Sequence, residues 1–419
     1  MNLNSHNNEI DGEALRGLRI LLVDDEPQMQ TVVNRYLEST FGRIEYTDDP
    51  ATAYQLLDNE YFDILLLDLH FPLANGFQLL ADWSTRLRMK HLKIIILSHE
   101  QDGHKISEGF GLPITRYIAK EDLPRELLPF LTHLGSEIVP CSRPNRIGWH
   151  LLNDLTHHPG NIIPYYQLKV NPRRPLAAEA LARWKNTEFA EAGSGIVPAG
   201  LFFPAIARLP EARQIDFIIL EQVCSQLRIW QKKAFPFIRV SVNFSASHFD
   251  QPESIPRILD ILRRFEISPR SLSIEITETD IMHNFDKASA MLRRLRELEI
   301  ETAMDDFGVA NSNLVNLVRL MNANTLDHVK LDGGLVDGIL TDATTLIVTR
   351  AQIQMLRRLG MAMTVERIDS AAKAQKMHEL DPTIYQQGFF INKPEPPEVL
   401  QERLQPAAVQ SLFERMGVA

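Results

Sequence analysis

The chain has 419 residues, 44% hydrophobic and 23% charged, which is ordinary globular composition and too long for one comfortable hydrophobic core. Its two cysteines, Cys141 and Cys224, exclude a disulfide framework and a thiolate-bound metal cluster, and they favour a reducing compartment. A net charge of −10 disfavours general binding of DNA or RNA, but not a small phosphorylated ligand held by metal.

Residues 1–17 are polar and lack the basic and apolar segments of a signal peptide. No later apolar run approaches the roughly 18 residues that cross a membrane, so we expect a cytoplasmic protein without membrane insertion. From residue 18 to 130, short apolar runs alternate with amphipathic stretches, which predicts a doubly wound α/β domain with a parallel sheet. The runs are Ile20–Val23, Ile64–Leu67, Ile94–Leu97 and Thr115–Ile118.

Polar side chains follow these predicted strands directly: Asp24 and Asp25, Asp68, Ser98 and Lys120. The carboxyl ends of parallel strands share one edge of a sheet, so these groups should converge there. Clustered carboxylates suit Mg²⁺, and a lysine with a hydroxyl can hold the remaining oxygens of a phosphoryl group. Each Asp alone would be explained as a helix cap, but five such residues at successive strand ends favour a phosphoryl site.

On these residues the segment 18–130 resembles a response-regulator receiver domain. The resemblance implies Asp68 as the phosphoacceptor, Ser98, Tyr117 and Lys120 as switch residues, and a sensor histidine kinase as partner. It also implies one Mg²⁺ held by Asp25, Asp68 and the His70 carbonyl, with Asp24 acting through water. The chain departs from the family at Glu121, where a proline usually follows the lysine.

Two prolines and several small polar residues interrupt the alternation around residues 138–147, which predicts a linker over 131–160. A second alternating stretch, residues 161–404, has the length of one TIM-like β/α barrel. We treat residues 405–419 as a C-terminal tail.

Within the predicted barrel, a polar residue interrupts or ends an apolar segment about every 35 residues, near the spacing of β/α units. These residues are Glu179, Asn243, Glu275, Asp305, Asp306, Lys330, Glu366 and Gln387. At the catalytic face of a barrel their oxygen atoms would favour Mg²⁺ or Mn²⁺ over zinc. Two such ions suit displacement at phosphorus, and Lys330 would stabilise the charge that develops there. Taken singly, a Glu or Asn could be a helix cap and Lys330 a surface lysine; the regular recurrence favours a site.

Residues from about 160 to 404 resemble an EAL domain, the barrel phosphodiesterase that linearises cyclic di-GMP to pGpG. The motifs are Ala178–Trp184, Val242–Asn243, Glu275–Glu278, Asp305–Gly308, Lys330–Asp332, Glu366 and Gln387–Pro394. The resemblance implies one metal held by Glu179, Asn243, Glu275 and Asp305, and another by Asp305, Asp306 and Glu366. It implies that Lys330 and Gln387 orient the attacking water, that Gln167, Leu181 and Arg183 contact the substrate, and that the protein is a homodimer. The tripeptide Glu13–Leu15 repeats the literal signature outside the barrel by chance.

Three positions depart from the EAL pattern. Leu168 replaces a proline, Val309–Asn311 replaces a Thr-Gly-aromatic sequence in a loop that in the family couples dimer contacts to the metals, and Arg367 replaces a glycine beside Glu366. Two functions therefore stay open. One is a phosphorylation-controlled cyclic di-GMP phosphodiesterase that requires Mg²⁺ or Mn²⁺, and the other is a weak or inactive sensor or protein-docking module switched by the receiver.

Overall fold

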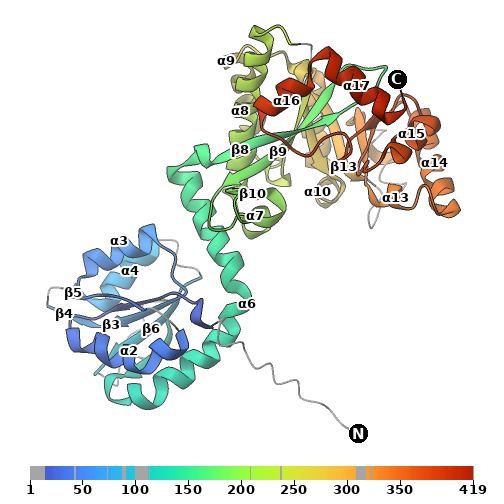
Figure 1. Ribbon diagram of the computed structural model, residues 1–419. Coiled ribbons are helices and arrows are strands. Elements are labelled where there is room, and N and C mark those ends of the chain that lie inside the picture. Colours follow the sequence, from blue (N-terminus) through green and yellow to red (C-terminus); the bar gives the residue numbers. More distant parts are fainter. Residues whose placement is uncertain are drawn as a thin grey trace. The chain divides into compact units, whose positions relative to one another are not determined.

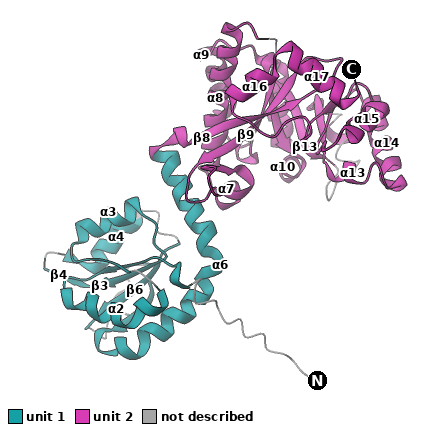
Figure 2. Cartoon of the chain, in the orientation of Figure 1, with its two compact units in different colours: residues 1–156 teal, residues 157–419 magenta. Residues whose placement is uncertain are grey.

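The computed structural model describes residues 15–41, 44–72, 74–86, 91–99, 112, 114–207, 209–235, 238–307, 318–320 and 323–418. It divides into two compact units, residues 1–156 and 157–419 (Figure 2). Within those residues we find no helix with the length and apolar character that a membrane crossing requires.

Unit 1 is built on a five-stranded parallel sheet with the order β2-β1-β3-β6-β7 (Figure 1). The strands are β1 (Ile20–Val23), β2 (Ile44–Thr47), β3 (Ile64–Asp68), β6 (Lys93–Ser98) and β7 (Ile114–Ala119). The predicted doubly wound parallel sheet is confirmed. Strand β2 is not among the predicted runs, because its two central residues are only partly buried and its sequence lacks an apolar run.

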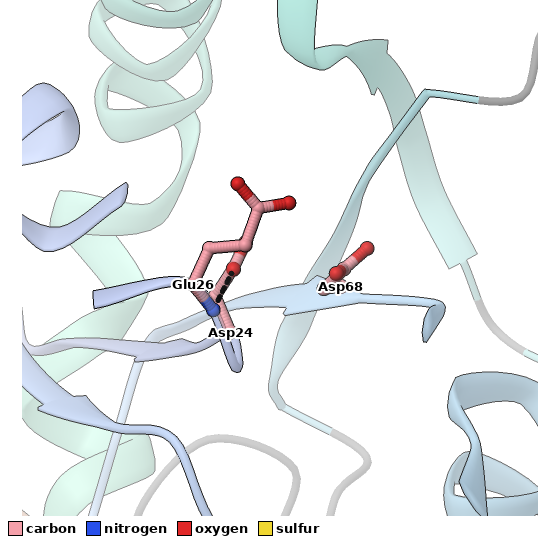
Figure 3. A group of neighbouring side chains, drawn as sticks. All are labelled: Asp24, Glu26 and Asp68. Carbon is pink, nitrogen blue, oxygen red and sulfur yellow. Dashed lines mark hydrogen bonds between the residues drawn. The ribbon is translucent and has the colours of Figure 1, made fainter. Parts of the chain in front are cut away.

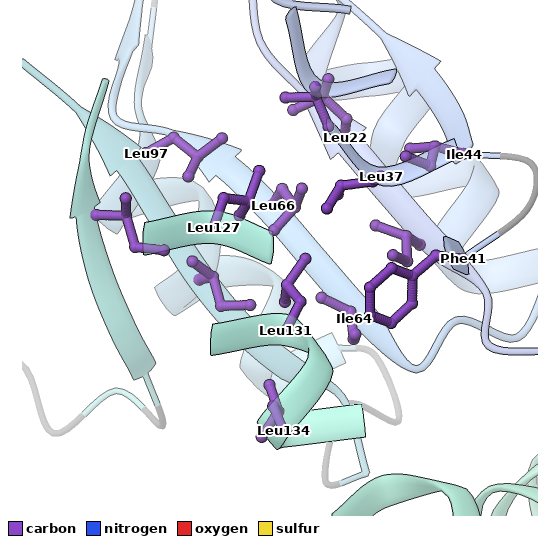
Figure 4. Close-up of a cluster of buried hydrophobic side chains, with 14 of the residues drawn as sticks. Leu22, Leu37, Phe41, Ile44, Ile64, Leu66, Leu97, Leu127, Leu131 and Leu134 are labelled. Carbon is purple, nitrogen blue, oxygen red and sulfur yellow. The ribbon is translucent and has the colours of Figure 1, made fainter. Parts of the chain in front are cut away.

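Helices cover both faces of this sheet: α2 (Pro27–Phe41), α3 (Pro50–Asn59), α4 (Gly76–Arg86) and α6 (Leu123–His157). Alternate strand residues point to opposite faces, so Leu22 and Leu66 pack with α2 and α6 in one core (Figure 4). Leu21 and Leu65 pack with α3 and α4 in the other. The short strands β4 (His70–Phe71) and β5 (Ala74–Asn75) form a separate hairpin.

The residues predicted as a linker are helical as far as His157, because α6 continues through Pro129, Pro140 and Pro144. Each proline removes a backbone donor from the helix, which ordinarily ends or kinks it. Buried residues on both sides of the prolines, including Leu134, Ile138 and Ile147, show that packing stabilises the helix across them.

Unit 2 has a nine-stranded sheet, in which seven strands from β9 onward run parallel. Its strands are β8 (Ile162–Lys169), β9 (Ala177–Lys185), β10 (Ile196–Pro198), β11 (Arg239–Asn243), β12 (Leu272–Thr277), β13 (Glu301–Phe307), β14 (His328–Leu331), β15 (Ala362–Val365) and β16 (Tyr385–Gln386). Strand β8 runs antiparallel to β9, and Val170 beyond its end exchanges backbone hydrogen bonds of 3.0 and 2.9 Å with Gln386 of β16. The first and last strands therefore meet, as in the predicted barrel, but the first is reversed because a short connection joins β8 to β9.

The helices of unit 2 are α7 (Ala199–Ile206), α8 (Ala212–Lys232), α9 (Ser254–Arg264), α10 (Glu278–His283), α11 (Phe285–Glu297), α13 (Gly334–Asp337), α14 (Ala343–Arg358), α15 (Ala371–Leu380), α16 (Pro397–Arg403) and α17 (Pro406–Met416). Residues 405–419, which we treated as a tail, contain α17. Its Leu412 and Met416 are buried, so most of this segment belongs to the fold.

Candidate functional site

Five carboxylates gather inside the barrel of unit 2. Glu179 comes from β9, Glu275 from β12, Asp305 and Asp306 from β13, and Glu366 from the residue after β15. Oxygens of Glu179, Glu275 and Asp305 lie within 4.8 Å of one another, and so do oxygens of Asp305, Asp306 and Glu366. Asp305 thus belongs to both groups. The barrel closure brings together residues that the sequence separates by up to 187 positions.

A bulge in β13 lets neighbouring aspartates serve the same cluster. Between Met304 and Phe307 the pairing with β14 shifts by one residue, and Asp306 adopts a left-handed backbone with φ of 58°. In a regular strand, consecutive side chains point to opposite faces. The extra residue re-aims one side chain, so both carboxylates reach Glu366.

Lys330 of β14 stands at the centre of the cluster and is 1% exposed. Its Nζ lies 3.1 Å from Glu179, 3.0 Å from both Glu275 and Asp305, and 2.9 Å from Glu366. Burial alone would lower the pKa of this ammonium, but the surrounding carboxylates raise it well above its usual range. Lys330 is therefore a fixed positive charge.

Lys169 of β8 is a second buried cation, which the sequence reading did not single out. Its Nζ donates to the Ser241 hydroxyl at 2.7 Å and forms an ion pair with Glu275. Burial pushes the pKa of Glu275 upward, but Lys169 and Lys330 together hold it at about 2. A lysine inside an apolar strand was the available signal, and its spatial neighbours were not visible in the sequence.

The two lysines do not balance the five carboxylates. Burial, together with Glu275, Glu179 and Glu366, raises the pKa of Asp305 to about 7, despite the opposing effect of Lys330. Burial also raises the pKa of Glu366. Such uncompensated negative charge, made only of oxygen donors, fits Mg²⁺ or Mn²⁺.

Amide side chains orient Glu179. Its Oε1 accepts from Asn243 Nδ2 at 2.9 Å, and its Oε2 accepts from Gln387 Nε2 at 2.8 Å. Gln387 Nε2 also donates to Gln167 Oε1 at 2.9 Å, and Gln167 donates onward to the backbone of Asn392. The structure therefore brings the predicted residues Gln167, Asn243 and Gln387 to the cluster.

The two other predicted substrate contacts lie on β9 beyond Glu179. Leu181 lines a largely apolar cavity of about 340 Å³ beside the cluster, together with Asn243, Phe244 and Glu275. Arg183 instead donates to the Ala182 carbonyl at 2.9 Å and stands over the Tyr165 ring. The residues Gly308 and Val309–Asn311, on which one predicted departure depends, lie outside the described part of the chain.

A smaller acidic group occupies the carboxyl edge of the sheet in unit 1 (Figure 3). It contains Asp24, Glu26 and Asp68, and Lys120 Nζ lies 3.0 Å from Asp24, 3.1 Å from Glu26 and 3.0 Å from Asp68. Asp24 and Asp68 are buried, whereas Glu26 is partly exposed. Asp25, the predicted ligand, is partly exposed and belongs to no such group among the described residues.

Glu26 was missed in the sequence although it directly follows the acidic pair. Its backbone N–H donates to Asp24 Oδ1 at 2.9 Å, and this turn brings its carboxylate back toward Lys120. Gly76 packs against the backbone that follows β3, since a Cβ there would lie 2.6 Å from the Asp68 carbonyl oxygen.

The remaining predicted switch residues lie on β6, which pairs with the strand of Asp68, and on β7, the next strand of the sheet. Ser98 ends β6 and is buried, and the Tyr117 ring of β7 lies 6.3 Å from the Phe77 ring. His70, whose carbonyl was predicted as a ligand, begins the β4 hairpin. Glu121, the departure from the family, pairs with His99 at 2.5 Å.

Comparison with family models matches residues 151–394 to the EAL domain and residues 20–131 to the response regulator receiver domain. Over 236 residues the chain is 30% identical to the signaling protein YkoW of Bacillus subtilis, covering 56% of this chain and 28% of that protein. It is 27% identical over 241 residues to MucR of Pseudomonas aeruginosa, a bifunctional diguanylate cyclase/cyclic di-GMP phosphodiesterase, covering 57% of this chain and 34% of MucR. The chain thus spans about a third of the length of these curated relatives.

Among solved structures, the PaMucR phosphodiesterase in its c-di-GMP complex aligns with a TM-score of 0.53 and 27% identity, covering 60% of this chain and 99% of that one. The FimX EAL domain aligns with a TM-score of 0.53 at 20% identity, covering 59% of this chain and 96% of that one, which supports the fold alone.

Proposed function

The chain belongs to the EAL domain family and carries a receiver domain ahead of the EAL domain, and we propose from this premise that it hydrolyses cyclic di-GMP to linear pGpG under phosphorylation control. The observation that carries the proposal is the cluster of five carboxylates, four of which pair with Lys330.

Two divalent cations fit this cluster. Glu179, Asn243, Glu275 and Asp305 would hold one, and Asp305, Asp306 and Glu366 the other. Such ions supply Lewis-acid stabilisation of phosphodiester oxygens. The raised pKa of Asp305 indicates that positive charge is favourable there.

The residues of the chain itself then position the reaction. Gln387 uses its Nε2 on Gln167 and Glu179, while its buried Oε1 has no hydrogen-bond partner among the described residues. This oxygen can accept a hydrogen bond from the attacking water and fix its position. The Lys330 ammonium stabilises the negative charge that develops on the phosphate oxygens.

The apolar cavity beside the cluster suits the base of a nucleotide. Leu181, Phe203 and Phe244 line it, and Asn243 and Glu275 connect it to the carboxylates. A phosphodiester at the cluster would therefore leave an adjacent base in contact with apolar side chains, as is common in ligand pockets.

The decisive experiment is conversion of cyclic di-GMP to pGpG by the full chain, with Mn²⁺ or Mg²⁺ and after chelation. Glu179→Gln keeps the shape of the side chain but removes a ligand charge, so it should abolish turnover. Glu191→Gln, an exposed carboxylate outside the cluster, serves as the matched control. Turnover by Glu179→Gln at the wild-type rate would refute the proposal.

In the receiver domain we propose that Asp68 accepts a phosphoryl group from a sensor kinase. Lys120 supports this assignment, because it pairs with Asp68 and can neutralise a phosphoryl oxygen. One Mg²⁺ would bind at Asp24, Asp68 and the neighbouring carboxylates of Asp25 and Glu26. We further propose that the phosphorylated receiver acts on the barrel through a homodimer.

The alternative function is a sensor that binds cyclic di-GMP without turnover. It is supported by Arg367, a bulky residue in a left-handed backbone with φ of 54° beside the predicted ligand Glu366. Tight binding of cyclic di-GMP with no pGpG formed in any metal would favour this alternative.

A further inference from the structure

A second cavity, of about 250 Å³, lies at the amino-terminal ends of the parallel strands of the barrel and is lined by several charged and polar side chains. The first residues of five strands line it, namely Ala177 of β9, Arg239 of β11, Glu301 of β13, His328 of β14 and Tyr385 of β16. The carboxylate cluster uses residues further along β9 and β13, and Glu275 of β12 both belongs to that cluster and lines this cavity. Barrel interiors are usually filled by branched apolar side chains, so a polar cavity at this end calls for a chemical explanation.

Three cationic and two anionic side chains line this cavity, so one positive charge has no carboxylate partner. Glu301 forms an ion pair with Arg239, and Glu275 forms one with Lys169. Arg174 lies at the exposed edge of the cavity and takes part in no ion pair within the described residues; its guanidinium lies 5.8 Å from the centre of the Tyr385 ring. The lining therefore offers a positive charge that no carboxylate neutralises.

Two buried side chains hold polar atoms available to a ligand. Lys169 is 4% exposed and has three N–H donors, of which Ser241 and Glu275 use two. His328 is 6% exposed, and its Nε2 lies 2.8 Å from the Thr364 hydroxyl. Its Nδ1 is 3.9 Å from Glu301, which is too far for a hydrogen bond. Both residues line the cavity, where the Ser273 hydroxyl also lies.

We propose that this cavity binds a small phosphate-class oxyanion between Arg174, Lys169 and His328. Such an anion would pair with the surplus guanidinium and accept from the third Lys169 N–H. A cation is disfavoured, because both lining carboxylates already hold cations. The volume suits inorganic phosphate or the phosphate ester of a small alcohol, and is small for a dinucleotide.

Glu275 belongs to both sites, but the two proposals are tested separately, because anion binding can be measured without metal, nucleotide or turnover. Removing divalent metal also prevents the probe from binding to metal ions at the carboxylate clusters. Failure of the hydrolysis assay would therefore leave this inference standing, and the reverse also holds.

The test is isothermal titration calorimetry of the metal-free full chain with inorganic phosphate and, in a second arm, with glycerol 3-phosphate. Saturable one-to-one binding is expected. Arg174→Met should weaken it about tenfold or more, since a hydrogen bond to a charged group is lost. Arg173→Met is the matched control, because Arg173 is exposed next to Arg174 but does not line the cavity.

Binding of both probes would identify a phosphomonoester site, and binding of inorganic phosphate alone a site for the free anion; both support the proposal. A Ser273→Ala variant should weaken binding less than Arg174→Met. The proposal is overturned if neither probe binds saturably, if Arg174→Met binds like the wild type, or if Arg173→Met loses as much affinity.

Discussion

The acidic groups of the two units use the same chemistry in different proportions. In unit 1 a single lysine, Lys120, faces Asp24, Glu26 and Asp68, and Glu26 is partly exposed. In unit 2 two buried lysines face five carboxylates. Formally the first group carries a charge of −2 and the second −3.

The comparison teaches how a buried lysine shapes an acidic site. Each lysine bridges carboxylates that would otherwise repel one another, and the charge left over sets how much cation the site can accept. The open edge in unit 1 suits one ion and a transferred phosphoryl group. The larger cluster in unit 2, which is buried at Glu179 and Glu275 and exposed at Asp306, suits two ions.

The largest effect on the difference between the two acidic groups is expected from removing Lys330, the central lysine of the barrel. Lys330→Met leaves four carboxylates, two buried and two partly buried, without their shared partner, so we expect turnover to fall by about a hundredfold to a thousandfold. Without metal, the free energy of unfolding should fall by about 3–5 kcal/mol, the usual cost of breaking a buried ion pair.

Lys376→Met, at a partly exposed lysine on α15 that pairs with Glu379, is the control. Hydrolysis rates and urea unfolding with and without Mn²⁺ would check this prediction. A fully active and stable Lys330→Met variant would contradict the central role of this ammonium.

In unit 1 the corresponding test is the loss of phosphoryl transfer when the predicted acceptor Asp68 is replaced. Asp68→Asn should abolish the labile adduct that acetyl phosphate forms, because the amide cannot act as the acceptor. Mass spectrometry of the intact chain measures this directly. Asp58→Asn on the exposed face of α3 should label like the wild type, and equal labelling of Asp68→Asn would move the acceptor elsewhere.

The excess negative charge in the barrel should make the stability of the metal-free protein depend on pH in an unusual way. Asp305 keeps its proton to about pH 7 in the folded chain, whereas in the unfolded chain it loses the proton near pH 4. Between these values the folded state binds more protons, so stability should fall as pH rises from 4 to 7.

Denaturant unfolding at several pH values would measure this slope. Mn²⁺ and Asp305→Asn should each reduce it, because one neutralises the cluster and the other removes the titrating group. A slope in Asp305→Asn equal to that of the wild type would assign the effect to other residues.

A smaller effect is expected at Arg367, whose left-handed backbone favours glycine. Arg367→Gly relieves this strain, and Arg367→Ala keeps it, while both lose the weak ion pairs to Asp332 and Asp337. The glycine variant should therefore be more stable than the alanine variant by about 1 kcal/mol in thermal or denaturant unfolding. Equal stabilities would show that the backbone relaxes.

The smallest expected effect is a difference in reactivity between the two cysteines. Cys141 is exposed on α6, whereas burial raises the pKa of the Cys224 thiol to about 12. At pH 8 the Cys224 thiol therefore stays protonated and shielded, and a thiol reagent should label one cysteine in the native protein and two after unfolding. Rapid double labelling of the native chain would contradict the burial of α8.

Local patterns predicted much of this molecule. Three of the five strands in the sheet of unit 1, β1, β3 and β6, follow from apolar runs, because a strand buried on both faces must be apolar throughout. Strand β7 was also predicted, from Thr115–Ile118, although most of its residues are exposed or only partly buried. The partly buried β2 gave no such run. The prolines of residues 131–160 predicted a break that packing along α6 overrides, and the apolar face of α17 was overlooked within a short C-terminal segment.

The sequence by itself determined which chemistry the chain carries, since carboxylates, amides and lysines at the ends of apolar segments already indicate cation and phosphate sites. Only the tertiary structure decided which of these groups meet. Lys330 and Glu179 are 151 positions apart, and Lys169 and Glu275 are 106 apart, so their pairing depends on barrel closure and strand register. The bulge at Asp306, the turn that returns Glu26 to Lys120 and the surplus charge of Arg174 are likewise long-range or conformational facts. Periodicity reports only the nearest neighbours of a residue along the chain, whereas the charge state of a buried group depends on every neighbour in space.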